Sequence, residues 1–147
     1  MHDITIRPAT PNDLAFILDL VVTTYKEQII KTYGEFNLKE QTDWWTKNLD
    51  SNFHEIIEFQ GHPAGLYGVS RTDSEINLEL MFLMPEFQGQ SIATHLLKEL
   101  INESKQTGKQ LITRCLKTHE SAKSFWLKKG FVIQNIDDKR IYFKYES

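Results

Sequence analysis

The chain has 147 residues, a formal net charge of −3, 40% hydrophobic residues and 25% charged residues. This composition is that of one globular domain spanning residues 1–147, and it excludes the disordered class. No block of like charge indicates a nucleic-acid partner, no apolar run approaches the ~20 residues of a membrane helix, and the first residues lack a signal-peptide pattern, so we expect a cytoplasmic protein.

The first third of the chain is predicted to hold one strand and two helices. Ile4–Arg7 alternates like a short strand. Thr10–Asp13 then supplies a cap residue, a proline at the first helical position and an acid in the first turn, so a helix is expected to begin there and to run to about Tyr25. Lys31–Asn37 is expected to be a loop, and a looser helix is predicted over Lys39–Leu49.

The middle of the chain changes to short apolar runs over residues 55–59, 64–70 and 76–84, separated by turn residues. This spacing predicts an antiparallel meander of three strands. Residues 92–106 then carry leucines at helical spacing, and Gly108 stands where a C-cap glycine belongs.

The last third is predicted to hold a strand over residues 111–116, a helix over 120–129 that ends at Gly130, and a hairpin of residues 131–136 and 140–145. The order of elements is that of an α+β protein, with one parallel strand-helix-strand unit in the middle.

The segment between the third strand of the meander and the helix that follows is rich in small residues. A strand that leads through such a turn into a helix can bind a phosphate, because the free N–H groups of the first helical turn point outward. The segment lacks the Gly-Lys-Ser/Thr ending of a Walker A loop and the G-x-G-x-x-G pattern of dinucleotide sites, which excludes both.

Gln88–Ala93 resembles the acyl-CoA signature Gln/Arg-x-x-Gly-x-Gly/Ala of the GNAT superfamily of N-acyltransferases, with Ser91 in place of the central glycine. Leu80–Pro85 resembles the apolar strand that precedes this signature, and His119–Phe131 resembles the family's Asn-x-x-Ala-x-x-x-Tyr-x-x-x-Gly-Phe. The order of elements is similar over nearly the whole chain. The resemblance implies a mixed, mostly antiparallel sheet of about seven strands with four helices and a central parallel strand pair splayed for the cofactor.

The resemblance also implies a set of residues that bind acetyl-CoA as co-substrate. Backbone groups of Met81, Phe82 and Leu83 would bind the pantetheine arm, and an amide near Leu83 would polarise the thioester carbonyl as an oxyanion donor. The pyrophosphate would lie against main-chain N–H groups of the segment Gln88, Gly89, Gln90, Ser91, Ile92, Ala93 and Thr94. His119 and Trp126 would lie near the sulfur, and since indole has no comparably acidic proton, the family tyrosine's role as general acid does not transfer to Trp126.

Glu79 is the candidate general base for the attacking amine. Strand alternation predicts that it shares a face with Met81 and Leu83, next to the thioester site. The alternative is a solvated charge on an exposed strand face. Aromatic residues between Tyr25 and Trp45 are expected mostly to pack in the core, with one or two lining an apolar acceptor pocket.

Cys115 is expected to be a small buried residue and not a nucleophile. The histidines have no ligand-like spacing, so no metal is expected. The leading hypothesis is transfer of an acetyl group from acetyl-CoA to a primary amine of a small molecule or peptide, by direct attack in a ternary complex. Two alternatives to this function stay open: a non-catalytic acyl-CoA sensor or interaction module of the same fold, and an unrelated α+β domain. A homodimer is a possible assembly.

Overall fold

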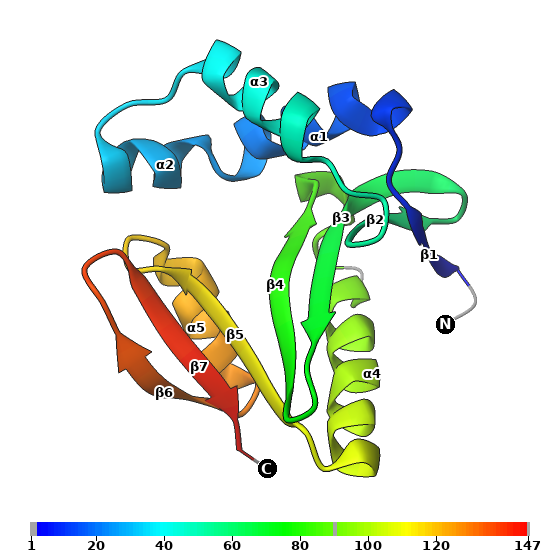
Figure 1. The fold of residues 1–147 in the computed structure, drawn as a ribbon, viewed down its shortest axis with the longest axis vertical. Helices are drawn as coiled ribbons and strands as arrows, with labels where there is room; N and C mark the ends of the chain where they lie inside the picture. The colour runs from blue at the N-terminus through cyan, green and yellow to red at the C-terminus, as the bar shows by residue number, and fades with distance from the viewer. Residues whose placement is uncertain (1–2, 90, 147) are drawn as a thin grey trace.

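The computed structural model describes residues 3–89 and 91–146, and Figure 1 shows their arrangement. The strands form one sheet in the order β1-β2-β3-β4-β5-β7-β6. They are β1 (Ile4–Pro8), β2 (His54–Phe59), β3 (His62–Arg71), β4 (Glu75–Leu83), β5 (Gln110–Leu116), β6 (Phe131–Ile136) and β7 (Arg140–Tyr145). The helices in the described ranges are α1 (Leu14–Thr24), α2 (Lys26–Tyr33), α3 (Leu38–Asn48), α4 (Ile92–Thr107) and α5 (Glu120–Lys128). The predicted fold class is confirmed, with one helix more than expected.

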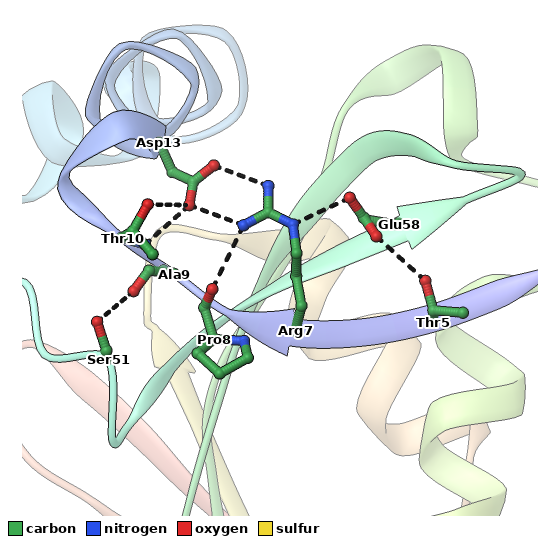
Figure 2. Close-up of polar contacts among 8 residues, drawn as sticks. All are labelled: Thr5, Arg7, Pro8, Ala9, Thr10, Asp13, Ser51 and Glu58. Carbon is green, nitrogen blue, oxygen red and sulfur yellow. Dashed lines mark hydrogen bonds and ion pairs between the residues drawn. The ribbon is translucent and has the colours of Figure 1, made fainter.

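An ion-pair network fixes the start of the chain to the sheet, as Figure 2 shows. The Arg7 guanidinium donates two hydrogen bonds to Asp13, at 2.9 and 2.8 Å, and a third to Glu58 of β2 at 3.0 Å. Asp13 also accepts a hydrogen bond from the backbone N–H of Thr10 at 2.8 Å. The predicted helix start therefore forms as a 3₁₀ turn over Pro11–Asp13, and α1 continues from it.

Two hydrophobic clusters place helices on both faces of the sheet. The first cluster packs α4 and α5 against β4, β5 and β7, with fully buried residues such as Ile76, Leu97 and Phe143. The second packs α1 and α3 against β2 and β3, with Leu20 and Leu66 at its centre. The sheet is thus the middle layer of three.

The parallel unit β4-α4-β5 forms as predicted, but its two strands pair over only four residues. Glu75–Leu78 of β4 pairs with Gln110–Thr113 of β5, and beyond this point no pairing is found along the described parts of the two strands. Thr113 Oγ1 donates to the carbonyl oxygen of Leu78 at 2.8 Å, at the last pair. The strands then diverge beneath α1–α3, as Figure 1 shows.

A β-bulge lies in β4 where the strands begin to diverge. Gly68 of β3 pairs with Leu80 and Val69 pairs with Leu78, so Glu79 is the extra residue. A bulge reverses the alternation of side chains, and Met81 packs with the first cluster whereas Leu80 packs with the second. The prediction that Glu79 shares a face with Met81 and Leu83 is wrong: Glu79 lies on the face covered by α1–α3.

The segment predicted as a loop over residues 31–37 is partly helical. α2 continues through Tyr33 and ends at Gly34, which has φ of 90°. Asn37 then caps α3, since its side chain accepts a hydrogen bond from the Glu40 N–H at 3.0 Å. α2 is held across the open end of the sheet by a 2.9 Å hydrogen bond between the hydroxyls of Thr32 and Thr118.

Candidate active site

Two cavities lie on opposite faces of the sheet and meet where β4 and β5 have separated. The first has a volume of about 450 Å³ and lies between β4, the start of α4 and one face of α5. The second has a volume of about 760 Å³ and lies between the strands and α1–α3. Four residues line both cavities: Met81, His119, Ala122 and Trp126. A ligand in one cavity therefore reaches a ligand in the other at this junction.

The first cavity collects nearly all the residues that the resemblance implied for a coenzyme. The lining includes Met81, Leu83, Gln88, Gly89, Ser91, Ile92, Ala93, Thr94, His119 and Trp126. Phe82 does not line this cavity; its side chain lies in the second, with its ring centroid 5.0 Å from that of Tyr25. Gln90 lies outside the described residues.

The segment before α4 has the backbone of an anion-binding turn. Gly89 has φ of 80° and Ser91 has φ of 64°, so both adopt the left-handed conformation. The Ser91 side chain makes no capping hydrogen bond to α4. Ser91 therefore leaves the first N–H groups of α4 to other partners, and the positive end of the helix dipole lies beside the first cavity.

The backbone of β4 presents polar groups to the gap. Met84 donates its N–H to Ala64 of β3 at 2.8 Å, and a Cβ at Gly65 would collide with the carbonyl oxygen of Phe82. The backbone groups of Phe82 and Met84 therefore face β3. Successive residues of a strand direct their N–H and C=O groups to opposite sides, so the N–H and C=O groups of Leu83, which lies between these two residues, point away from β3 and toward the gap. The Leu83 carbonyl oxygen accepts from Gln88 Nε2 at 3.0 Å, which leaves its N–H as the donor facing the cavity.

Sequence reasoning missed several residues of α5 and the loop after it. Ser121, Ala122 and Phe125 line the first cavity. Lys129 donates to Thr94 Oγ1 at 3.1 Å and brings a positive charge to the start of α4. The helical spacing that links Ala122 and Phe125 was the signal that could have found Phe125.

The junction holds one titratable side chain, His119. Burial lowers the pKa of His119 below its usual 6.5, so the imidazole is neutral at pH 7 and can accept a proton. Trp126 is 7% exposed and packs on Phe131 with ring centroids 5.2 Å apart. Trp126 is thus a core residue with one edge at the junction.

The second cavity combines an aromatic wall with charged residues. All five aromatic candidates line it: Tyr25, Tyr33, Phe36, Trp44 and Trp45. This is more than the one or two expected, although Trp45 is also buried in the core. Burial raises the pKa of Tyr25 to about 12, so its phenol stays protonated. Glu79 lies in this cavity, where it accepts from Ser70 Oγ at 2.6 Å and pairs with Arg114 at 3.4 Å.

Two further findings concern other chemistry. Burial raises the pKa of Cys115 to about 11, so its thiol is protonated at neutral pH and is a poor nucleophile. Within residues 3–89 and 91–146 no group of three or more histidine, cysteine or carboxylate side chains is placed to hold a metal ion. Over the same ranges no helix has the length and hydropathy to cross a membrane.

Residues 21–141 match a family model described as an acetyltransferase (GNAT) domain. No curated protein sequence matches the chain. The matched region contains β4, β5 and the segment 88–91 before α4.

Solved structures of the same fold are similar over nearly their full lengths. The PaiA N-acetyltransferase of Thermoplasma acidophilum, solved with coenzyme A, is 16% identical, with a TM-score of 0.73 and coverage of 98% of this chain and 99% of that one. The ribosomal-protein-S18-alanine N-acetyltransferase of Escherichia coli is 16% identical, with a TM-score of 0.64 and coverage of 97% and 92%. The yncA protein of Salmonella typhimurium, solved with acetyl-CoA, is 16% identical, with a TM-score of 0.57 and coverage of 98% of this chain and 94% of that one. At these identities the likeness supports the fold alone.

Proposed function

The chain belongs to the GNAT acetyltransferase family, and from this premise we propose that it transfers an acetyl group from acetyl-CoA to the primary amine of a small molecule or peptide. The observation that carries the proposal is the meeting of two cavities through the gap between β4 and β5. A thioester that enters from one face can meet an amine that enters from the other. No covalent enzyme intermediate is needed, which agrees with the protonated thiol of Cys115.

The first cavity fits a coenzyme on the chemistry of its lining. The turn of Gly89 and Ser91 and the uncapped start of α4 offer N–H groups to a pyrophosphate. Lys129 adds a positive charge at the same place. Acetyl-CoA supplies an acyl group on a thiol that leaves readily near neutral pH. The N–H of Leu83, which faces the gap, would polarise the thioester carbonyl.

The amine must lose a proton as it attacks, and two side chains near the junction are candidates to receive it. Glu79 stays the proposed general base, although both of its oxygens already have partners, Ser70 and Arg114. His119 lies at the junction itself and is neutral. The amine nitrogen forms its bond to the acyl carbon as the carbon–sulfur bond breaks, and coenzyme A leaves as the thiol.

The test is release of free thiol from acetyl-CoA in the presence of amines, amino acids and peptides. We expect release with at least one class of acceptor and none without protein. The rival function is a GNAT-like sensor that binds acyl-CoA without transfer, and Trp126 in place of tyrosine is the observation that favours it. Calorimetric binding of acetyl-CoA without thiol release across the panel would establish the sensor, and absence of binding would exclude both.

Glu79→Gln and His119→Asn, compared side by side, decide which group is the base. If Glu79 is the base, Glu79→Gln lowers kcat/KM most at low pH, where the free amine is scarcest, by about 10²-fold or more. His119→Asn then keeps the shape of the pH–rate profile. An unchanged profile in Glu79→Gln and a changed one in His119→Asn would transfer the role to the histidine.

A further inference from the structure

The second cavity contains two arginine side chains that the proposed transfer chemistry does not use. Arg114 of β5 and Arg140 of β7 both line it. Cys115 and Ile141, which are next to these arginines in sequence, pack with the first hydrophobic cluster on the α4 and α5 side. Alternation therefore directs both arginines to the opposite face, the one beneath α1–α3.

The register of the strands makes Arg114 and Arg140 neighbours on that face. In the register of β5 and β7, Arg114 pairs with Tyr142 and Leu116 pairs with Arg140, so the arginines are diagonal partners on adjacent strands. Both charges act on the buried hydroxyl of Tyr25, where they partly oppose the rise in its pKa that burial causes. Two like charges side by side repel, and such an arrangement is favourable when an anion lies between them.

Three carboxylates line the cavity with the two arginines, but only one of them, Glu79, belongs to the strands. Arg114 contacts Glu79 at 3.4 Å. The guanidinium of Arg140 has no ion pair among the residues that the structure describes; its acidic neighbour Asp137 accepts the backbone N–H of Arg140 at 2.7 Å and does not line the cavity. Glu35 and Glu40 also line the cavity, but they belong to the helical cover and not to the strands. The strand side of the cavity therefore carries one carboxylate and two guanidinium groups.

We infer that the acceptor is a free α-amino acid with an apolar or aromatic side chain, whose carboxylate binds Arg140 and Arg114 and whose amine lies beside Glu79. This inference rests on the proposed function. Adjacent opposite charges on the protein, 3.4 Å apart, complement the amine and the carboxylate that share one carbon in an amino acid. Guanidinium groups bind carboxylates with paired hydrogen bonds. The aromatic wall contributed by Tyr25, Phe36 and Trp44 takes the side chain.

The reaction at this site is balanced without a further reactant. The acetyl group passes from sulfur to the α-nitrogen as the carbon–sulfur bond breaks, one amine proton passes by way of the base to the departing thiolate, and the products are the N-acetyl amino acid and coenzyme A as the thiol. The carboxylate takes no part in bond making. It fixes the position of the amine at the junction beside Met81 and His119.

The experiment compares acceptors that differ only in the carboxylate. Leucine, phenylalanine and tryptophan are each assayed by thiol release against the matching amino-acid amide and the matching decarboxylated amine. Wild-type protein is expected to show kcat/KM higher by about 10- to 100-fold for the free acid of at least one set, as for a hydrogen bond to a charged group. Equal rates for acid, amide and amine would overturn the inference while leaving acetyl transfer established. No thiol release with any amine would overturn both.

Variants separate carboxylate recognition from loss of fold. Arg140→Gln is expected to lose about 10-fold or more for the free acid and less than about threefold for the amide, and Arg140→Lys is expected to recover part of the loss. The matched control is Arg71→Gln, which removes an arginine that pairs with Glu103 outside the cavity and leaves all acceptors unchanged. An equal loss for acid and amide in Arg140→Gln would contradict the assignment.

Discussion

Ser91 is a single residue whose conformation conflicts with its type. Its φ of 64° is one that residues other than glycine enter at a cost of roughly 1–2 kcal/mol. It stands where the GNAT signature has glycine, and its hydroxyl is left free for a ligand because it does not cap α4. Compared with glycine, the serine thus has a less favourable backbone conformation and one additional hydrogen-bond donor.

Ser91→Gly is expected to keep the affinity for coenzyme A similar, since the lost hydroxyl donor is offset by a relaxed turn. The free energy of unfolding should rise by less than about 1 kcal/mol, because glycine also gains entropy in the unfolded chain. Ser91→Val, which is β-branched, should lower it by about 1 kcal/mol or more. Calorimetry and urea unfolding measure the two effects. Much tighter binding in Ser91→Gly would show that the serine is a defect.

Residue roles could be predicted only where a contiguous pattern carries them. The turn Gln88–Thr94 was visible in the sequence, and its described residues line one cavity. The face of Glu79 was mispredicted, because a bulge inserts one residue without a clear mark in the local pattern. Ser121 and Arg140 could not be assigned, because their places depend on how α5 and β7 pack beside strands distant in sequence.

At the scale of elements, Asp13 helps to hold the start of α1 against β1 and β2 through its hydrogen bonds with Arg7. The Arg7 guanidinium holds the pKa of Asp13 below its usual 3.8. A depressed folded pKa means that the stabilisation is present above about pH 4 and is lost as pH falls through the folded pKa. The side chain of Asp13 is 11% exposed, so solvent screens the pair little on that side.

Asp13→Asn is expected to lower the free energy of unfolding by about 1–2 kcal/mol at pH 7. The difference from wild type should shrink as pH falls below 4. Urea unfolding at pH 7 and pH 3 measures both. Asp43→Asn serves as control, because the side chains of Asp43 and Lys39 are 67% and 84% exposed and such pairs contribute little. An equal loss at both pH values would contradict the ionic origin of the effect.

Strands and long helices followed from local patterns, whereas α2 did not. The meander, α4 with its C-cap at Gly108, and the last hairpin form where alternation, helical spacing and turn residues predicted them. α2 has eight residues, none of them buried, and isolated helices of this length are marginal in water. Contacts from other elements hold it, including Thr118 to Thr32 and Lys139 over the ring of Tyr33 at 5.6 Å.

At the scale of the whole molecule, the homodimer stays a prediction, and the edge strand β6 is the surface through which we expect two copies to pair. β6 is last in the sheet, and its Val132, Ile133 and Ile136 side chains are 36%, 42% and 52% exposed. An exposed apolar edge strand readily pairs with another strand. If two copies pair here, sedimentation gives twice the monomer mass and Ile136→Lys gives the monomer. Leu38→Lys, on the distant α3, leaves the mass unchanged. A monomeric wild type would refute the pairing.

The four residue pairs between β4 and β5 have a further consequence for how the molecule holds together. The strands β1–β4 and the strands β5–β7 are joined along the sheet by this short ladder, and the first cavity is lined from both sides of it, by β4 and the start of α4 on one side and by α5 on the other. A ligand bound in the first cavity contacts both halves of the sheet with their helices. By mass action, such a ligand raises the free energy of unfolding by about 2.7 kcal/mol at a free concentration of one hundred times Kd. Binding of the co-substrate and the connection between the two halves of the sheet therefore depend on the same cavity.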